Sequence, residues 1–150
     1  MLKSKAVMRF FALIFLSVSL VVSARAEDAP KQATLYKSPD CTCCEGHARY
    51  LKRNGIPVTV IEAPDLSAVK KAHGVPPEFE GCHTILYDGY VIEGHVPINT
   101  IRKLLRERPA ITGISLPGMP LGAPGMYGTK EGPLVIYEIT DGEKRVFSTE

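Results

Sequence analysis

The sequence predicts one α/β domain in which a small sheet is flanked by helices. Apolar runs rich in β-branched residues alternate with segments whose apolar residues recur at helical spacing, as expected when strands alternate with helices. Two Asp-Gly pairs, at residues 88–89 and 141–142, separate apolar runs and favour tight β-hairpins. A chain of 150 residues with 45% hydrophobic side chains has room for one globular core and is too apolar for a disordered protein.

The domain is expected to begin with a strand and a helix. Residues 33–36 form a short apolar run, and the Ser-Pro-Asp turn after it favours the start of a helix. This helix is predicted over residues 41–54, where an Asn-Gly pair ends it. Within it Cys44, Ala48 and Leu51 recur at positions i, i+4 and i+7, which predicts its buried face.

A second strand and a shorter helix follow. Residues 56–61 are rich in β-branched residues and are predicted to form the strand. Residues 65–73 are predicted to form the helix, which begins at Asp65, a favourable N-cap, and stops before a glycine. Leu66 and Val69 are expected to be its buried side chains.

The remaining elements are a hairpin, a helix and a second hairpin. The first hairpin joins residues 84–87 to residues 90–93, and a third helix over residues 98–108 ends at a proline. Residues 134–139 and 145–147 are predicted to form a C-terminal hairpin. The order β-α-β-α-β-β-α, with cysteines at the start of the first helix, is typical of a small thioredoxin-like sheet flanked by helices.

The N-terminal residues 1–26 have the features of a secretory signal peptide: basic residues, an apolar stretch and an Ala-Arg-Ala cleavage site at 24–26. An uncleaved membrane anchor is the alternative, but the apolar stretch is short for a span of about 20 residues. Cleavage removes 4 of the 18 basic residues and no acidic one, so residues 27–150 carry 14 basic and 16 acidic side chains, a net charge of −2. We therefore expect a periplasmic domain that leaves the membrane after cleavage and has no basic patch for nucleic acid.

Three of the four cysteines fall within four positions. Cys41, Cys43 and Cys44 are close neighbours, and Cys82 is distant. Of the three disulfide pairings, those with Cys43–Cys44 or Cys41–Cys43 bonds are strained, which leaves Cys41–Cys44 with Cys43–Cys82. Disulfides within so short a cluster would stabilise little, which disfavours a purely structural role.

One functional interpretation is redox catalysis. Cys41 and Cys44 form a CxxC pair that opens a helix, and a helix N-terminus stabilises a thiolate. Cys43 is not needed for disulfide exchange and would compete for the disulfide. A thiol–disulfide oxidoreductase that uses Cys41 and Cys44 is therefore the alternative function. Whether the protein is an enzyme stays open, and no residue is assigned a catalytic role at this point.

The favoured interpretation is a soft-metal site. Thiolates select copper(I) or zinc, and successive helical residues point about 100° apart. Cys43 and Cys44 therefore suit bridged metal ions better than one tetrahedral zinc, and Cys82 would close the cluster. We expect the metal to be copper, bound as Cu(I), and zinc is less favoured. Conversion between Cu(I) and Cu(II) is a possible activity of such a site.

Three histidines are considered as additional ligands or supporting groups. His47 follows the cysteines by one helical turn, and His95 follows the first hairpin, so both are candidates. His83 adjoins Cys82, but alternation along a strand is expected to direct His83 to the opposite face.

Residues 109–133 are expected to form a lid over the cysteines. This segment of 25 residues contains six glycines and five prolines, and a loop of that length usually has a function. Met119 and Met126 lie within it, either as copper ligands through their thioethers or as side chains packed onto the domain.

The combination of these motifs resembles the CopG-like family of small exported metal-binding proteins. The matching motifs are Tyr36-Lys37-Ser38-Pro39, Cys41-Thr42-Cys43-Cys44, Gly81-Cys82-His83-Thr84, residues 88–97 and the Pro-Gly-Met motifs at 117–126. Relatives often have an aromatic residue at position 47 and a histidine at position 50, whereas this chain has His47 and Tyr50.

The resemblance covers nearly all of residues 33–127. It implies a thioredoxin-like fold, a periplasmic copper-resistance role and a copper–thiolate site. The implied ligands are Cys41, Cys43, Cys44 and Cys82, and less directly Met119, Met126 and His95. We therefore expect copper ions and other periplasmic copper-handling proteins as partners.

Overall fold

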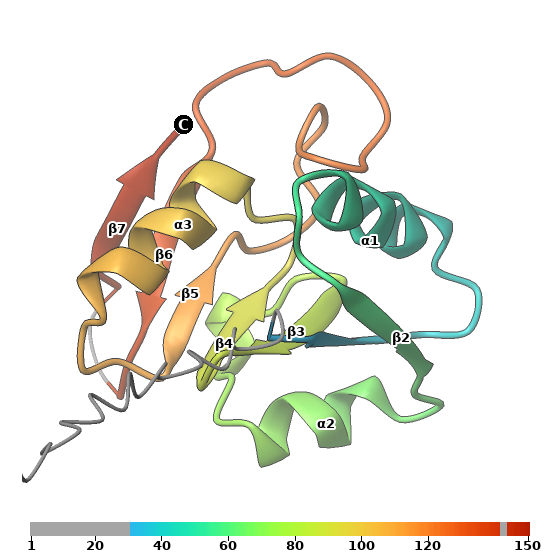
Figure 1. Ribbon diagram of the computed structural model, residues 1–150, viewed down its shortest axis with the longest axis horizontal. Coiled ribbons are helices and arrows are strands. Elements are labelled where there is room, and N and C mark those ends of the chain that lie inside the picture. The colour runs from blue at the N-terminus through green and yellow to red at the C-terminus, as the bar shows by residue number, and fades with distance from the viewer. Residues whose placement is uncertain (1–30, 142–143) are drawn as a thin grey trace, which may run out of the picture.

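The computed structural model describes residues 31–141 and 144–150, and these contain a seven-stranded sheet in the order β2-β1-β3-β4-β5-β6-β7 (Figure 1). The strands are β1 (Ala33–Lys37), β2 (Val58–Glu62), β3 (His83–Tyr87), β4 (Tyr90–Glu93), β5 (Gly113–Ser115), β6 (Val135–Ile139) and β7 (Val146–Thr149). β1 runs parallel to β2 and β4 parallel to β5, whereas the other neighbours are antiparallel. The predicted signal peptide, residues 1–26, lies outside the described residues.

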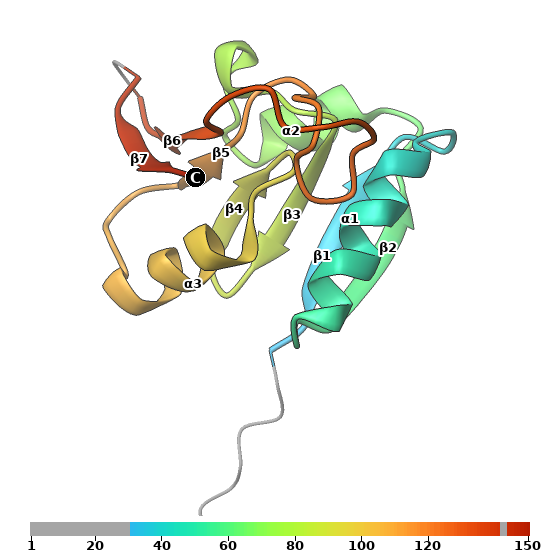
Figure 2. The same cartoon turned by 90° about the horizontal axis from the view of Figure 1, so that it is seen from above.

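Helices cover both faces of the sheet. α1 (Thr42–Arg53) and α3 (Ile98–Glu107) lie on one face, and α2 (Leu66–Ala72) lies on the other (Figure 2). The short 3-10 helix η1 (Pro77–Phe79) follows α2. The predicted element order from β1 to α3 is confirmed. Among the described residues, none of these helices is long and apolar enough to cross a membrane.

The main core lies between the sheet and the pair α1 and α3. The predicted inward face of α1 is confirmed, because Cys44, Ala48 and Leu51 are all buried. Its buried partners on the central strands and on α3 are Ile85, Ile92, Ile114, Ile101 and Leu104. The N-terminal turn of α1 is therefore fixed against the ends of the central strands by apolar packing.

The opposite face of the sheet carries polar residues where it meets α2. Thr84 and Glu93 are buried there, and the buried residue of α2 is Lys70. The prediction that Leu66 and Val69 fill this role is wrong, since both are only half-buried. A buried lysine is tolerated here because its ammonium pairs with the Glu93 carboxylate.

The segment 109–133 is not a single loop, because Gly113–Ser115 form β5, which lies between β4 and β6 in the sheet. The backbone of β5 comes very close to that of β4: a Cβ added to Gly113 would lie 1.8 Å from the carbonyl oxygen of Val91. Only glycine permits this approach. A three-residue strand that begins with glycine gives little periodic signal, which explains why the sequence prediction missed it.

The predicted C-terminal hairpin is confirmed. β6 and β7 are antiparallel neighbours, and they extend the same sheet through β5. The remaining part of the glycine- and proline-rich segment, residues 116–133, crosses from β5 to β6 past the N-terminal end of α1 (Figures 1 and 2).

Candidate metal centre

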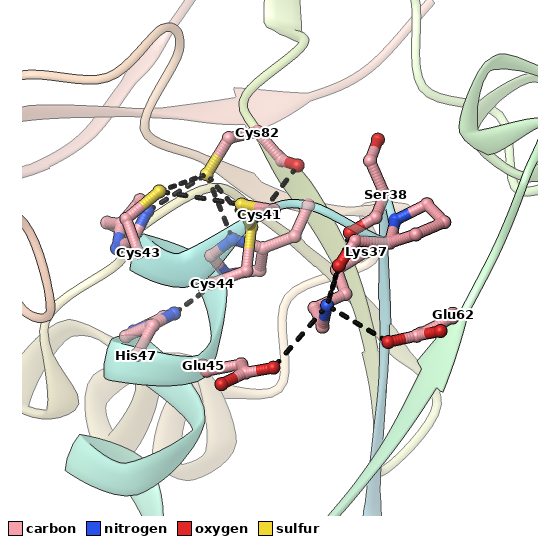
Figure 3. Close-up of a disulfide and its surroundings, with 12 residues drawn as sticks. Lys37, Ser38, Cys41, Cys43, Cys44, Glu45, His47, Glu62 and Cys82 are labelled. Atoms are coloured by element: carbon pink, nitrogen blue, oxygen red, sulfur yellow. Dashed lines mark hydrogen bonds and ion pairs between the residues drawn. A yellow bond between two sulfur atoms is a disulfide. The ribbon is translucent and has the colours of Figure 1, made fainter.

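Helix α1 begins inside the cysteine motif. Cys41 is its N-cap residue, and the sulfur of Cys41 forms a disulfide with Cys44, whose Cα atom lies 5.5 Å away. The turn before the helix is held by Lys37, which is only 1% exposed. Its ammonium donates hydrogen bonds to the carbonyl oxygens of Ser38, at 3.2 Å, and Pro39, at 2.8 Å (Figure 3).

Cys82 reaches the same point from the sheet. It lies in a bend just before β3, and its Sγ atom is 3.6 Å from that of Cys44 and 4.0 Å from that of Cys43 (Figure 3). The Sγ atoms of Cys41 and Cys43 are 3.4 Å apart. All four sulfurs lie within 4.8 Å of one another. Of the two disulfides in the unstrained pairing, only Cys41–Cys44 is formed, and Cys43 and Cys82 are free thiols.

Three histidines form a second cluster beside the sulfurs. His47 of α1, His83 of β3 and His95 after β4 are each 0% exposed, and one ring nitrogen of each lies within 4.8 Å of the others. Cys82 joins the two clusters, because its Sγ is 3.1 Å from Nδ1 of His83 and 2.9 Å from Nε2 of His95.

Strand alternation predicts that His83 points away from Cys82, and this prediction is wrong, because His83 faces the cysteines. β3 begins at His83, so the residue shares the face of buried Ile85, which packs toward α1. Cys82 precedes the strand and is not held by its pleat, so its sulfur turns toward the same face. His83 lies two residues before the apolar Ile85 and therefore on the same face of the strand. This spacing was the sequence signal that could have identified His83 as a member of the cluster.

Two glycines bring His95 back to the cysteines. Gly94 ends β4 with a φ of 75°, a conformation that favours glycine. A Cβ added to Gly81 would lie 2.7 Å from the Cα of Gly94, so the loops before β3 and after β4 touch through their backbones. On its other side His95 contacts the glycine- and proline-rich segment, since its Nδ1 lies 2.7 Å from the carbonyl oxygen of Pro124.

The segment 116–133 is seated on α1 through a glycine–glycine contact. A Cβ added to Gly46 would lie 2.7 Å from the carbonyl oxygen of Gly125, which itself has a φ of 85°. The two predicted methionine ligands differ in position. Met126 is partly buried and packs against the main core, whereas Met119 is 60% exposed. Both remain proposals as ligands.

Burial controls the protonation of both clusters. It lowers the pKa of His47 to about 3 and also lowers the pKa values of His83 and His95, so the three imidazoles are neutral at pH 7. Burial, reinforced by the neighbouring Cys43, raises the pKa of the Cys82 thiol to about 12. Neutral imidazoles are ready to bind a metal ion, whereas Cys82 must first release a proton.

A buried ion pair fixes the backbone next to Cys82. The ammonium of Lys70 pairs with the Glu93 carboxylate, which also accepts hydrogen bonds from the Thr84 hydroxyl, at 2.7 Å, and from the amide of Gly81, at 2.8 Å. Burial raises the pKa of Glu93, and Lys70 opposes that rise. Because Gly81 directly precedes Cys82, this pair anchors the loop that carries the thiol. No motif in the sequence indicates this pair.

The arrangement offers a compact set of soft donors in a sheltered position. Thiolate sulfur and imidazole nitrogen are the ligands that copper and zinc prefer, and the described residues place four cysteine sulfurs beside three imidazoles. With the Cys41–Cys44 disulfide closed, only Cys43 and Cys82 carry free thiols. The same four sulfurs can therefore serve metal binding or disulfide chemistry, depending on their oxidation state.

Comparisons with known proteins identify relatives of the whole domain. The model of a family described as a protein of unknown function, DUF411, matches residues 79–126. Two solved structures described as copper resistance protein copG, form 2 and form 1, are each 37% identical to the chain and superpose with a TM-score of 0.74. Each covers 81% of this chain, which in turn covers 99% of the first structure and 98% of the second. No curated protein matches the chain. On these similarities, the chain belongs to the CopG-like family.

Proposed function

We propose that this protein serves copper resistance by binding copper(I) in a cysteine-thiolate site. The observation that carries the proposal is the convergence of Cys41, Cys43, Cys44 and Cys82, with all four ligand atoms within 4.8 Å. The two similar solved structures are described as copper resistance proteins, which supports copper as the metal rather than zinc.

We propose that the site holds more than one copper ion. Cys43 and Cys44 are successive residues of α1, so their side chains leave the helix about 100° apart. Although the two side chains leave the helix in different directions, the four sulfurs lie within 4.8 Å of one another, close enough for neighbouring ions to share them. His83 and His95, whose ring nitrogens lie 3.1 and 2.9 Å from the sulfur of Cys82, would add nitrogen ligands at the edge of such a site.

Copper binding by all four sulfurs requires that an external thiol reductant open the Cys41–Cys44 disulfide, supplying two electrons and two protons and forming a disulfide of its own. In the reverse direction, the thiols of Cys41 and Cys44 release two protons and two electrons when they form the disulfide. Two Cu(II) ions can accept those electrons and become two Cu(I) ions. A copper redox activity is therefore a natural extension of the binding role.

The Cys41–Cys44 disulfide itself favours the alternative function, thiol–disulfide exchange. The pair lies at the N-terminus of α1, where the helix dipole stabilises a thiolate. The strand order β2-β1-β3-β4 with three helices supports a thioredoxin-like core, which suits either function. In this alternative Cys43 and Cys82 have no required role.

Reconstitution with copper(I) under reducing conditions tests the proposal. The wild-type protein is expected to bind copper(I) tightly, and the Cys41→Ser/Cys44→Ser variant to lose most of that binding. Ser67→Ala, on the opposite face of the sheet, serves as the matched surface control. Weak binding by the wild type, or binding unchanged in the double-serine variant, would overturn the copper-site proposal.

The remaining parts of the proposal concern the cell. We propose that residues 27–150 function in the periplasm, that residues 1–26 direct export, and that other copper-handling proteins exchange copper with this site. The segment 116–133 would act as the lid, because its backbone contacts both His95 and α1 at the edge of the sulfur cluster. Met126, which packs against the core, is better placed than the exposed Met119 to contribute a thioether.

A further inference from the structure

We propose that His47 is a positioning residue that keeps a proton on Nε2 of His83, so that the free electron pair on Nδ1 of His83 faces the sulfur of Cys82. The inference rests on the proposed metal-binding function for its purpose. Its geometry is a chain of hydrogen bonds that starts at a backbone carbonyl and ends at the thiol.

The chain begins at Val96. Its carbonyl oxygen can only accept a hydrogen bond, and it lies 3.1 Å from Nε2 of His47. Nε2 of His47 must therefore carry a proton. His47 is fully buried, where a charged imidazolium would lose its hydration, so the ring carries one proton only. Its Nδ1 is consequently an acceptor.

The next bond transfers this constraint to His83. Nδ1 of His47 lies 2.8 Å from Nε2 of His83, and since the former is an acceptor, the latter must be the donor. His83 is also fully buried, so the same argument gives it a single proton, and its second nitrogen, Nδ1, has none. That nitrogen lies 3.1 Å from Sγ of Cys82.

His95 reaches the same sulfur by an independent route. The carbonyl oxygen of Pro124, an acceptor only, lies 2.7 Å from Nδ1 of His95, which must therefore carry the proton of that ring. Nε2 of His95 is then unprotonated and lies 2.9 Å from Sγ of Cys82. Two carbonyl groups thus direct two imidazole electron pairs toward one thiol.

This arrangement prepares the histidines for a metal ion. A metal-binding imidazole needs a free electron pair toward the ion, and a hydrogen bond at its other nitrogen fixes that tautomer. In the copper-free protein one of the two electron pairs can accept the single proton of the Cys82 thiol, and the other faces the sulfur without a proton between them. When copper(I) replaces that proton, the same nitrogens already face the ion.

His47→Phe and His47→Gln separate this positioning role from a general packing role. Phenylalanine keeps a ring in the buried space but has no donor or acceptor, whereas the glutamine amide keeps one of each. His73→Phe, at the C-cap of α2, is the control histidine outside the cluster.

The direct test is imidazole ¹⁵N NMR of the copper-free protein, which reports which nitrogen of each ring is protonated. In the wild type we expect His83 protonated on Nε2 and His95 protonated on Nδ1. In His47→Phe the His83 resonances should indicate a mixture of tautomers, and His47→Gln should restore the wild-type pattern. A wild-type His83 protonated on Nδ1, or a pattern unchanged in His47→Phe, would overturn the inference.

Titration with copper(I) links the tautomer to binding. Loss of a hydrogen bond that orients a ligand typically lowers metal affinity 10–100-fold. We expect a loss of that size in His47→Phe and near-wild-type affinity in His47→Gln and His73→Phe. Failure of the wild type to bind copper would contradict the proposed function but not the tautomer assignment, because the NMR measurement contains no copper. If His47→Phe does not fold, the wild-type and His47→Gln spectra still decide the assignment.

Discussion

The sulfur of Cys82 lies 3.6 Å from the sulfur of Cys44, although the two residues are 38 positions apart. One belongs to the first turn of α1 and the other to the bend before β3. Their contact makes one site from a short helical motif and a single distant cysteine. It also places a free thiol beside one half of the Cys41–Cys44 disulfide.

Cys43→Ser distinguishes the copper site from disulfide exchange. If the four sulfurs share copper ions, removal of Cys43 should lower both the affinity for copper(I) and the number of ions bound. If Cys41 and Cys44 act alone as a redox pair, the same variant should keep its disulfide reductase activity and lose little else. Copper titration and a disulfide reductase assay on the same preparation check the prediction. Full copper binding by Cys43→Ser would contradict the shared site.

The three buried histidines should make the copper-free protein less stable in mild acid. In the unfolded chain they take up protons below about pH 6.5. In the folded protein burial lowers all three pKa values, that of His47 to about 3. The unfolded state therefore binds more protons between these limits, and the free energy of unfolding falls as the pH falls, by up to about 1.4 kcal/mol per pH unit for each histidine.

Denaturant unfolding of the copper-free protein at pH 7, 6 and 5 measures this slope. His47→Gln should flatten it, and Ser67→Ala, which removes no titratable group, should leave it unchanged. A stability that stays constant from pH 7 to pH 5 would show that the histidines are protonated as easily in the folded protein as in the unfolded chain.

Gly46→Ala should destabilise the protein although it removes a glycine from a helix. Replacing glycine by alanine inside a helix would by itself stabilise the helix by about 1 kcal/mol. The added Cβ, however, would lie 2.7 Å from the backbone oxygen of Gly125 and would displace the segment 116–133 from α1. Gly132→Ala, where the structure leaves open space, is the matched control. Thermal unfolding of both variants decides the outcome, and a stabilised Gly46→Ala would show that the segment does not rest on the helix.

Lys70→Met should be strongly destabilising, because it leaves the Glu93 carboxylate buried without its cation. Breaking a buried pair in this way typically costs about 3–5 kcal/mol. The double variant Lys70→Met/Glu93→Gln should recover most of that loss, since no charge is then left unpaired. Chemical denaturation of the two variants checks this. Equal destabilisation of both would mean that packing, and not charge pairing, accounts for the effect.

The parts of this protein that follow a local rule were predictable. The inward face of α1 follows from the spacing of Cys44, Ala48 and Leu51, and the hairpins from their Asp-Gly turns. The parts that depend on tertiary contact were not. β5 has three residues and owes its place to the close approach of Gly113 to Val91.

The candidate site shows the same division. The three adjacent cysteines were evident from the sequence, and Cys82 could be joined to them because cysteines are few. His83 was misplaced because strand alternation was extended one residue beyond the start of β3. The pair of Lys70 and Glu93 gives no sequence signal at all, since two charged residues 23 positions apart reveal nothing about burial.

Metal analysis of the protein recovered from cells grown with copper tests the central claim most directly. The protein is produced with its own N-terminal segment, and the oxidation state of its cysteines is measured on the same sample. We predict that copper accompanies the protein and that Cys41 and Cys44 are reduced in the copper-bound fraction. Protein that is free of copper and retains the Cys41–Cys44 disulfide would contradict a copper-binding role.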